Sequence, residues 1–80
     1  MSLTIQILTP EGTLFEGPVS AVFLPGSYCP FEVLPMHAPI ISALSAGDIR
    51  VREEGEERVF PVKGGVVSVL NDRITICAEV

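Results

Sequence analysis

Apolar and polar residues alternate along most of this chain with a period of two residues. Leu3, Ile5 and Ile7 fall on one side of an extended backbone, whereas Thr4 and Gln6 fall on the other. Such alternation is typical of half-buried strands. Gly and Pro interrupt the pattern at short intervals, and the stretches between them predict nine strands, over residues 3–7, 13–16, 19–24, 28–34, 40–44, 48–53, 58–63, 66–70 and 73–78.

The connections between these stretches have the composition of turns. Asn71-Asp72 is a two-residue connection of the kind that favours positive φ. Gly55 lies within a run of glutamates and predicts a hairpin tip in water, while Pro30 and Pro61 indicate edge or bulged positions. Short strands at this spacing, with no linker and no internal repeat, predict an all-β fold. We expect one domain over residues 1–80, a flattened β-sandwich or barrel of about nine to ten short strands.

The chain carries more apolar surface than a domain of its size can bury. Of its 80 residues, 48% are hydrophobic and only 19% are charged, whereas roughly 25% are charged in an average soluble domain. Because a small domain has a large surface for its volume, we expect at least one exposed apolar face that a partner covers.

Charge and targeting signals exclude several classes of partner. The net charge of −5 disfavours binding to nucleic acid and direct adsorption to anionic lipid, because both need clustered Lys and Arg. No apolar run approaches the length of a membrane span, and residues 1–4 lack the basic start of a secretory signal. We therefore expect no direct membrane insertion and no routing through secretion.

The two cysteines are too few for a disulfide framework and lie far apart, without the spacing of a metal site. We expect both to be reduced. Cys77 lies in an apolar, strand-like stretch, so we expect it to behave as a small core residue.

His37 is the single histidine of the chain, and Pro35 and Pro39 hold it in a stiff corner. A catalytic base needs a nucleophile, and those near it in sequence are Ser27, Cys29, Ser42 and Ser45. No nucleophile elbow is present, so an imidazole bonded to nearby backbone is the favoured interpretation. Gly64-Gly65 lacks the spacing of a phosphate-binding loop. The residues thus predict no catalytic, cofactor-binding or metal-binding site and no small-molecule substrate.

Several short motifs occur in order along the whole chain. The most specific combination is Pro-x-His-Ala-Pro at residues 35–39, followed 25 residues later by Gly64-Gly65. The others are Leu3-x-Ile5-x-Ile7-x-Thr9-Pro10-Glu11-Gly12, Phe15-x-Gly17-x-Val19, Leu24-Pro25-Gly26, Leu44-x-x-Gly47-x-Ile49 and Ile74-Thr75-Ile76 before Ala78-Glu79. In these residues the chain resembles the N-terminal β-sandwich of the epsilon subunit of F-type ATP synthases, whose mitochondrial counterpart is called delta.

The resemblance implies a non-catalytic subunit of the central stalk, the rotor of the enzyme. Such a subunit binds the gamma subunit and the ring of c subunits (the c-ring), so that ion-driven rotation of the ring is coupled to ATP synthesis. The implied location is the cytoplasmic side of the inner or plasma membrane, where the subunit is peripheral and held as part of the complex. No cofactor is implied.

The resemblance also implies two contact regions. The implied gamma contacts are Thr9, His37 and Ser42. The loop implied to face the c-ring includes Tyr28, Cys29, Pro30, Phe31 and Glu32. Exposed aromatic residues are common anchors of interfaces, which suits Tyr28 and Phe31. For Phe31, packing into the core of the sandwich is an equally good interpretation.

Two features depart from the family pattern. Cys29 and Glu32 stand where members usually have glycine, and residues with a Cβ resist positive φ, so we expect the loop over residues 27–33 to follow its own path. Many relatives continue into a C-terminal helical hairpin that inhibits ATP hydrolysis, whereas this sequence stops at Val80. We expect a short form without that inhibitory arm.

Two other classes of function stay open. A free-standing β-sandwich that binds a peptide or sugar needs a concave aromatic face, and one tyrosine, four phenylalanines and no tryptophan supply it poorly. A small hydrolase would depend on His37 alone. Copurification with gamma distinguishes the rotor subunit from both.

Overall fold

The computed structural model describes residues 3–80, and these form nine strands and no helix. The prediction of an all-β fold is confirmed. Residues 1 and 2, which belong to the predicted domain and to the start that lacks a secretory signal, lie outside the described residues. The strands are β1 (Leu3–Thr9), β2 (Gly12–Val19), β3 (Ala21–Leu24), β4 (Phe31–Val33), β5 (Ile40–Leu44), β6 (Gly47–Glu53), β7 (Glu56–Val62), β8 (Gly64–Leu70) and β9 (Arg73–Glu79).

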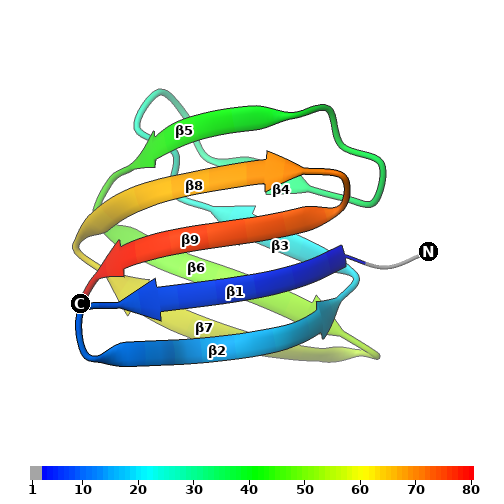
Figure 1. The fold of residues 1–80 in the computed structure, drawn as a ribbon, viewed down its shortest axis with the longest axis horizontal. Coiled ribbons are helices and arrows are strands. Elements are labelled where there is room, and N and C mark those ends of the chain that lie inside the picture. The colour runs from blue at the N-terminus through cyan, green and yellow to red at the C-terminus, as the bar shows by residue number, and fades with distance from the viewer. Residues whose placement is uncertain (1–2) are drawn as a thin grey trace.

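The strands form two sheets that pack face to face as a sandwich (Figure 1). The five-stranded sheet has the order β2-β1-β9-β8-β5, and the four-stranded sheet has the order β4-β3-β6-β7. Strands β1 and β9 are parallel, whereas every other named pair is antiparallel. The first and last strands of the chain therefore meet in the middle of one sheet.

Alternation along the strands places one set of apolar side chains between the sheets. Leu3, Ile5 and Ile7 of β1 are fully buried, and Ile74 and Ile76 of β9 lie beside them in register. Burial of each such side chain stabilises the fold by about 1.5–3 kcal/mol. The other core residues come from both sheets and are Val19, Val22, Leu24, Val33, Leu44, Ile49, Val51, Val62, Val67, Val69 and Ala78.

The four edge strands of the two sheets each contain a proline or follow one directly. Pro18 lies in β2 and Pro61 in β7, while Pro30 and Pro39 immediately precede β4 and β5. A proline has no N–H to offer to a neighbouring strand, so these edges are poor templates for pairing with a second chain. The edge position predicted for Pro61 is confirmed.

Backbone hydrogen bonds close the sandwich beside β5. The N–H of Ser27 donates to the carbonyl of Ala43 at 3.0 Å, so the connection between β3 and β4 pairs with the end of β5. Gly26 makes this close approach possible. A Cβ at Gly26 would lie 2.5 Å from the carbonyl oxygen of Cys29 and 2.9 Å from the ring of Phe31. The ring of Phe31 packs over this glycine and against the core.

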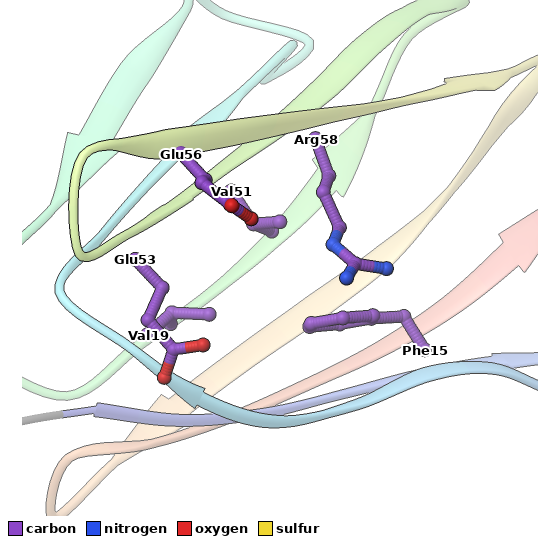
Figure 2. Close-up of a pocket in the computed structure, with 6 residues that line it drawn as sticks. All are labelled: Phe15, Val19, Val51, Glu53, Glu56 and Arg58. Carbon is purple, nitrogen blue, oxygen red and sulfur yellow. The ribbon is translucent and has the colours of Figure 1, made fainter.

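Side chains close the opposite side, between β2 and β7. The ring centroids of Phe15 and Phe60 are 5.4 Å apart, and the guanidinium of Arg58 lies 5.5 Å from the centroid of Phe15. Figure 2 shows Arg58 stacked over Phe15, with the carboxylates of Glu53 and Glu56 at the mouth of a small hollow. The hollow measures about 50 Å³, which suits ordered water rather than a ligand.

Cys77 is exposed, so the prediction that it is a core residue is wrong. Ile74, Ile76 and Ala78 of the same strand are buried. Because side chains alternate along a strand, Cys77 between Ile76 and Ala78 faces outward. Cys77 shares its side of β9 with Thr75 and Glu79, so strict alternation already indicated an outward position, which the prediction from the apolar stretch overlooked.

Several predicted strand bounds are also wrong. Strand β2 continues through Gly17 and Pro18 to Val19, which the pattern had assigned to the following strand. Gly64-Gly65 belongs to β8, not to a turn, and residues 28–30 precede β4. The register explains the first difference, since Val19 pairs with Leu3 of β1. Pairing with a neighbouring strand overrides local turn signals.

Candidate interaction surface

Four outward-facing residues form a row across the five-stranded sheet. Leu8 of β1, Cys77 of β9, Val66 of β8 and Ala43 of β5 are successive cross-strand partners. Side chains at such positions lie about 4.5–5.5 Å apart and touch one another. We call these four residues the apolar row. It crosses four of the five strands without a polar side chain.

The apolar surface continues along β5 and β8. Ile41 is 78% exposed and Leu70 is 54% exposed, and both point away from the core. Two shallow hollows occur on this side of the sheet, one beside Leu8 and Val66 and the other beside Ile41 and Leu70. We call the apolar row together with Ile41 and Leu70 the apolar face. The exposed apolar surface expected from the composition is therefore present.

Charges are confined to the margins of the apolar face. Strands β1, β5, β8 and β9 contain only two charged residues, Arg73 and Glu79, which are the first and last residues of β9. The neighbouring outward row, Gln6, Thr75 and Ser68, is polar, and it carries a charge only where it reaches Glu16 on edge strand β2. A surface of this kind loses little hydration of charged groups when another protein covers it.

The outer side of the four-stranded sheet has the opposite character. Arg50 lies 3.6 Å from both Asp48 and Glu57, and these side chains are between 41% and 47% exposed. The guanidinium of Arg52 lies 5.5 Å from the centroid of the Phe23 ring. Exposed pairs of this kind are screened by water and add little stability, but they keep the surface hydrated. The two outer sides of the sandwich thus differ sharply in polarity.

The implied gamma contacts Thr9, His37 and Ser42 do not gather in one small patch. Strand β1 is parallel to β9. Strand β8 is antiparallel to both β9 and β5, so β5 runs in the same direction as β9 and therefore as β1. Thr9 ends β1, whereas His37 precedes the start of β5, so the two residues lie at opposite ends of the sheet (Figure 1). Ser42 pairs with Val67, and its side chain is on the inward side of the edge strand. A partner that touches all three must span the sheet.

His37 is the last residue of a tight turn. Its N–H donates to the carbonyl of Leu34 at 3.2 Å, Pro35 occupies the second position, and Met36 has a φ of 68°. These are the features of a type II turn. The Nδ1 of His37 donates to the carbonyl of Ala38 at 2.7 Å, because a carbonyl only accepts. The favoured interpretation, an imidazole bonded to nearby backbone, is confirmed.

The nucleophiles considered for a hydrolase do not contact the histidine. The hydroxyl of Ser42 donates to the carbonyl of Ala43 at 3.0 Å, and that of Ser45 lies 3.4 Å from the hydroxyl of Ser27. Within residues 3–80, no hydrogen bond joins a serine or cysteine side chain to His37. Among the residues that the structure describes, no serine or cysteine is therefore paired with His37 as a nucleophile with its base.

The implied c-ring loop lies at the end of the sandwich opposite His37. Tyr28 is fully exposed, and Cys29 and Pro30 beside it are also exposed. Phe31 and Glu32 are half-buried because they begin β4, and Phe31 packs against the core. Neither Cys29 nor Glu32 has a positive φ, so the loop turns without the conformations that favour glycine. The protruding part of this loop is the segment from Tyr28 to Pro30.

Other charged clusters make no site in the described part of the chain. The four glutamates of the hairpin between β6 and β7 are exposed, as expected, and Glu54 and Gly55 form its tip with positive φ. Among residues 3–80, no group of three His, Cys, Asp or Glu side chains is placed to hold a metal ion. The same residues include no helix long and apolar enough to cross a membrane.

The apolar face was not predicted residue by residue. Its signal in the sequence is the occurrence of adjacent apolar residues, such as Ile40-Ile41, Val66-Val67 and Ile76-Cys77. In a strand, adjacent apolar residues place apolar side chains on both sides of a sheet. The pattern indicates a sheet that is apolar on both sides, but not which side is inside.

A family model and the curated relatives both match this chain to ATP synthase delta or epsilon chains. The family described as ATP synthase, Delta/Epsilon chain, beta-sandwich domain matches residues 2–80. The chain is 38% identical over 76 residues to the ATP synthase epsilon chain of Synechococcus elongatus. That alignment covers 95% of this chain and 56% of the relative, so the chain spans little more than half the length of the relative.

Two solved structures share the fold. A chain in the Euglena gracilis mitochondrial ATP synthase, described as OSCP/F1/c-ring, has a TM-score of 0.90 at 19% identity and is matched over 50% of its length by 96% of this chain. A chain in the Tetrahymena thermophila mitochondrial ATP synthase, described as central stalk/c-ring, has a TM-score of 0.82 at 17% identity, with 65% of it covered by the whole of this chain.

Proposed function

The chain belongs to the β-sandwich family of ATP synthase delta and epsilon chains, and on this basis we propose that it is a non-catalytic subunit of the central stalk. In this role it binds the gamma subunit and the c-ring, and so helps rotation of the ring reach gamma. These partners hold it, as a peripheral protein, at the cytoplasmic side of the inner or plasma membrane. Chemistry takes place in other subunits.

The observation that carries the proposal is the difference between the two outer sides of the sandwich. The apolar face has a row of four apolar residues across four strands, and the charged residues on this side of the sheet, Glu16, Arg73 and Glu79, are at its margins. The side with Arg50 and Arg52 is hydrated and paired. Apolar surface that is neutral and contiguous is the usual mark of a protein interface. We assign the apolar face to gamma.

The size of the outer side of the five-stranded sheet, which contains the apolar face, suits that assignment. The molecule measures 30 × 23 × 19 Å, and the view in Figure 1 is along the shortest axis, so the five-stranded sheet presents the two longer dimensions. An ordinary interface takes about 800 Å² from each partner, which is comparable with the area of this side. A partner that covers it reaches both Thr9 and His37 at the two ends of the sheet.

The c-ring is assigned to the loop with Tyr28. This loop leaves the sandwich at the end opposite His37 and is not part of the apolar face. The two assignments therefore do not compete for the same surface. A rigid sandwich with partners at a broad side and at one end transmits torque better than a flexible connection, because backbone hydrogen bonds hold its strands in register.

A pair of matched substitutions tests the assignment to gamma. Val66 and Val59 are 48% and 42% exposed, and they lie on the outer sides of the five-stranded and four-stranded sheets, respectively. Val66→Glu places a charge in the centre of the apolar row, where a partner would have to desolvate it, so binding to the cognate gamma subunit should fall at least about a hundredfold. Val59→Glu should leave binding within about threefold.

The measurement is the dissociation constant by isothermal titration calorimetry, with circular dichroism melting to confirm that both variants are folded. Equal affinity of the two variants would exclude the apolar face as the gamma site. Failure of the unmodified chain to bind gamma, with binding to a peptide or sugar instead, would favour the free-standing binding module.

A further inference from the structure

The turn over Leu34–His37 holds an unfavourable conformation in an exposed place. Its third residue, Met36, has a φ of 68°, in the left-handed region that favours glycine. The side chain of Met36 is 74% exposed, so burial of that side chain does not offset the strain. A strained backbone persists only when its surroundings hold it, and such positions cluster at functional sites. The question is what holds this one.

A carboxylate from a distant part of the chain holds the turn. The N–H of Met36 donates to Oδ1 of Asp72 at 2.6 Å, across a separation of 36 residues. Figure 1 shows the two segments side by side, the connection before β5 next to the turn between β8 and β9. A hydrogen bond to an ionised acceptor is about twice as strong as one between neutral groups. Asp72 therefore adds a strong tether to the internal hydrogen bond of the turn.

Asp72 is itself fixed on two sides. Together with Asn71 it forms the two-residue connection between β8 and β9. Both residues have a positive φ, 50° for Asn71 and 60° for Asp72. Its backbone carbonyl accepts the N–H of Thr4 from β1 at 2.9 Å. The carboxylate thus projects from the end of the three central strands of the five-stranded sheet, β1, β9 and β8. The hydrogen bond to Asp72 therefore fixes the position of Met36 relative to the paired strands of the sheet.

The tethered turn is continuous with the apolar face. The hollow beside Ile41 and Leu70 also includes Pro39, which follows the turn in sequence. Leu34 and Met36 add exposed apolar surface at this end, at 49% and 74% exposure. Methionine packs adaptably against irregular surfaces. The turn thus extends the apolar face beyond the strands, at the end where His37 lies.

We propose that Asp72 is a positioning residue for gamma recognition, because its carboxylate holds the Leu34–His37 turn in the conformation that presents Met36 and His37 to the partner. The proposal rests on the proposed function. It assigns a direct contact to Met36 and an indirect role to Asp72, whose side chain is turned to the Met36 amide.

Three substitutions within one turn separate this role from a general loss of structure. Asp72→Gly removes the carboxylate, yet glycine readily adopts the positive φ of this position. Asp72→Asn retains an oxygen acceptor and also tolerates positive φ. Asn71→Gly changes the same turn without touching Met36, and it is the matched control.

The first readout is the backbone amide of Met36, followed by NMR in the unbound chain. Asp72→Gly should shift its proton resonance upfield and speed its exchange with solvent, whereas Asp72→Asn and Asn71→Gly should retain a protected amide. The second readout is affinity for the cognate gamma subunit. Asp72→Gly should weaken binding about tenfold, the effect expected from one charge-assisted hydrogen bond, and Asn71→Gly should leave it within about twofold.

Met36→Gly provides an independent route if Asp72→Gly lowers the folded fraction. Glycine needs no tether at a φ of 68°, so in that background Asp72→Gly should weaken binding by less than about threefold further. An unchanged Met36 amide in Asp72→Gly would overturn the proposal, and so would an affinity equal to that of Asn71→Gly. If the unmodified chain does not bind gamma, the proposed function fails before any substitution is made, while the amide still reports on the tether.

Discussion

Gly65 is the position at which a single methyl group should damage the fold most. A Cβ built there would lie 2.3 Å from the carbonyl oxygen of Cys77 and 3.1 Å from the Cα of Ala78, and Gly65 has a φ of 150°. The obstacle is the backbone of the neighbouring strand β9, which is held by β1 and β8 and has little freedom to move. Gly65→Ala must therefore separate β8 from β9 locally.

The cost has two parts. An unfavourable φ costs on the order of 1–3 kcal/mol, and forcing an extra methyl group into a packed region costs about 1–3 kcal/mol. Together they predict a loss of about 2–6 kcal/mol in the free energy of unfolding. The total stability expected for a chain of this length is only about 4–12 kcal/mol. At about 4–8 °C per kcal/mol, the melting temperature should fall by about 8–48 °C.

Substitutions at two other glycines distinguish the cost of the unfavourable φ from the cost of the added methyl group. Gly12 has a φ of 134°, and a Cβ added at this position would meet nothing within 4 Å, so Gly12→Ala should show the backbone cost alone, about 1–3 kcal/mol. At Gly64 a Cβ would meet the carbonyl oxygen of Leu44 at 3.4 Å, an ordinary contact without a positive φ. Gly64→Ala should therefore change stability by no more than about 0.5 kcal/mol in either direction.

The assay is urea denaturation followed by far-ultraviolet circular dichroism, with the slope against urea checked to be the same in all variants. Gly65→Ala should be the least stable, Gly12→Ala intermediate and Gly64→Ala similar to the unmodified chain. A Gly65→Ala variant within about 0.5 kcal/mol of Gly64→Ala would refute the argument from the close approach of β8 and β9.

Two further predictions concern exposed positions. Tyr28→Ala should leave the melting temperature unchanged, because the side chain is fully exposed. It should nevertheless weaken binding of the gamma-bound chain to purified c-ring at least about tenfold in surface plasmon resonance, with Leu14→Ala as a control at another exposed site. Retention of full c-ring affinity would remove Tyr28 from the contact. Pro61→Val restores an N–H to edge strand β7 and should increase self-association in sedimentation velocity at high concentration. The control Pro10→Val, in the turn after β1, should not increase it. A monomeric Pro61→Val variant would show that this proline does not protect the edge.

Much of the strand content could be predicted from local pattern. The alternation of Ile49 and Val51 with Arg50 and Arg52 in β6 identifies both sides of that strand, because one phase is charged. The positive φ of Asn71 and Asp72 also follows from residue type. These predictions succeed because each depends on residues close together in the sequence.

The candidate site could be predicted only in part. In β9 the charged and polar residues Arg73, Thr75 and Glu79 identify the outer side, but in β8 the neighbours Val66 and Val67 are both apolar, so the local pattern could not tell which of the two is buried. Pairing with β5, which is distant in the sequence, helps to decide which side of β8 is buried. The tether from Asp72 to Met36 has the same cause, since nothing local to either residue indicates the other.

The central position of β9 has a consequence for synthesis of the protein. During translation, strand β1 emerges first, but its neighbour on the inner side, β9, contains residues 73–79 and is the last of the nine strands to appear. Until then the five-stranded sheet lacks its middle, and Ile5 and Ile7 lack the partners Ile74 and Ile76. Such distant pairing makes folding slow compared with that of helical proteins of similar size. The sheet can therefore be completed only after residues up to Glu79 have left the ribosome tunnel, and until then its unpaired apolar strands are exposed to aggregation.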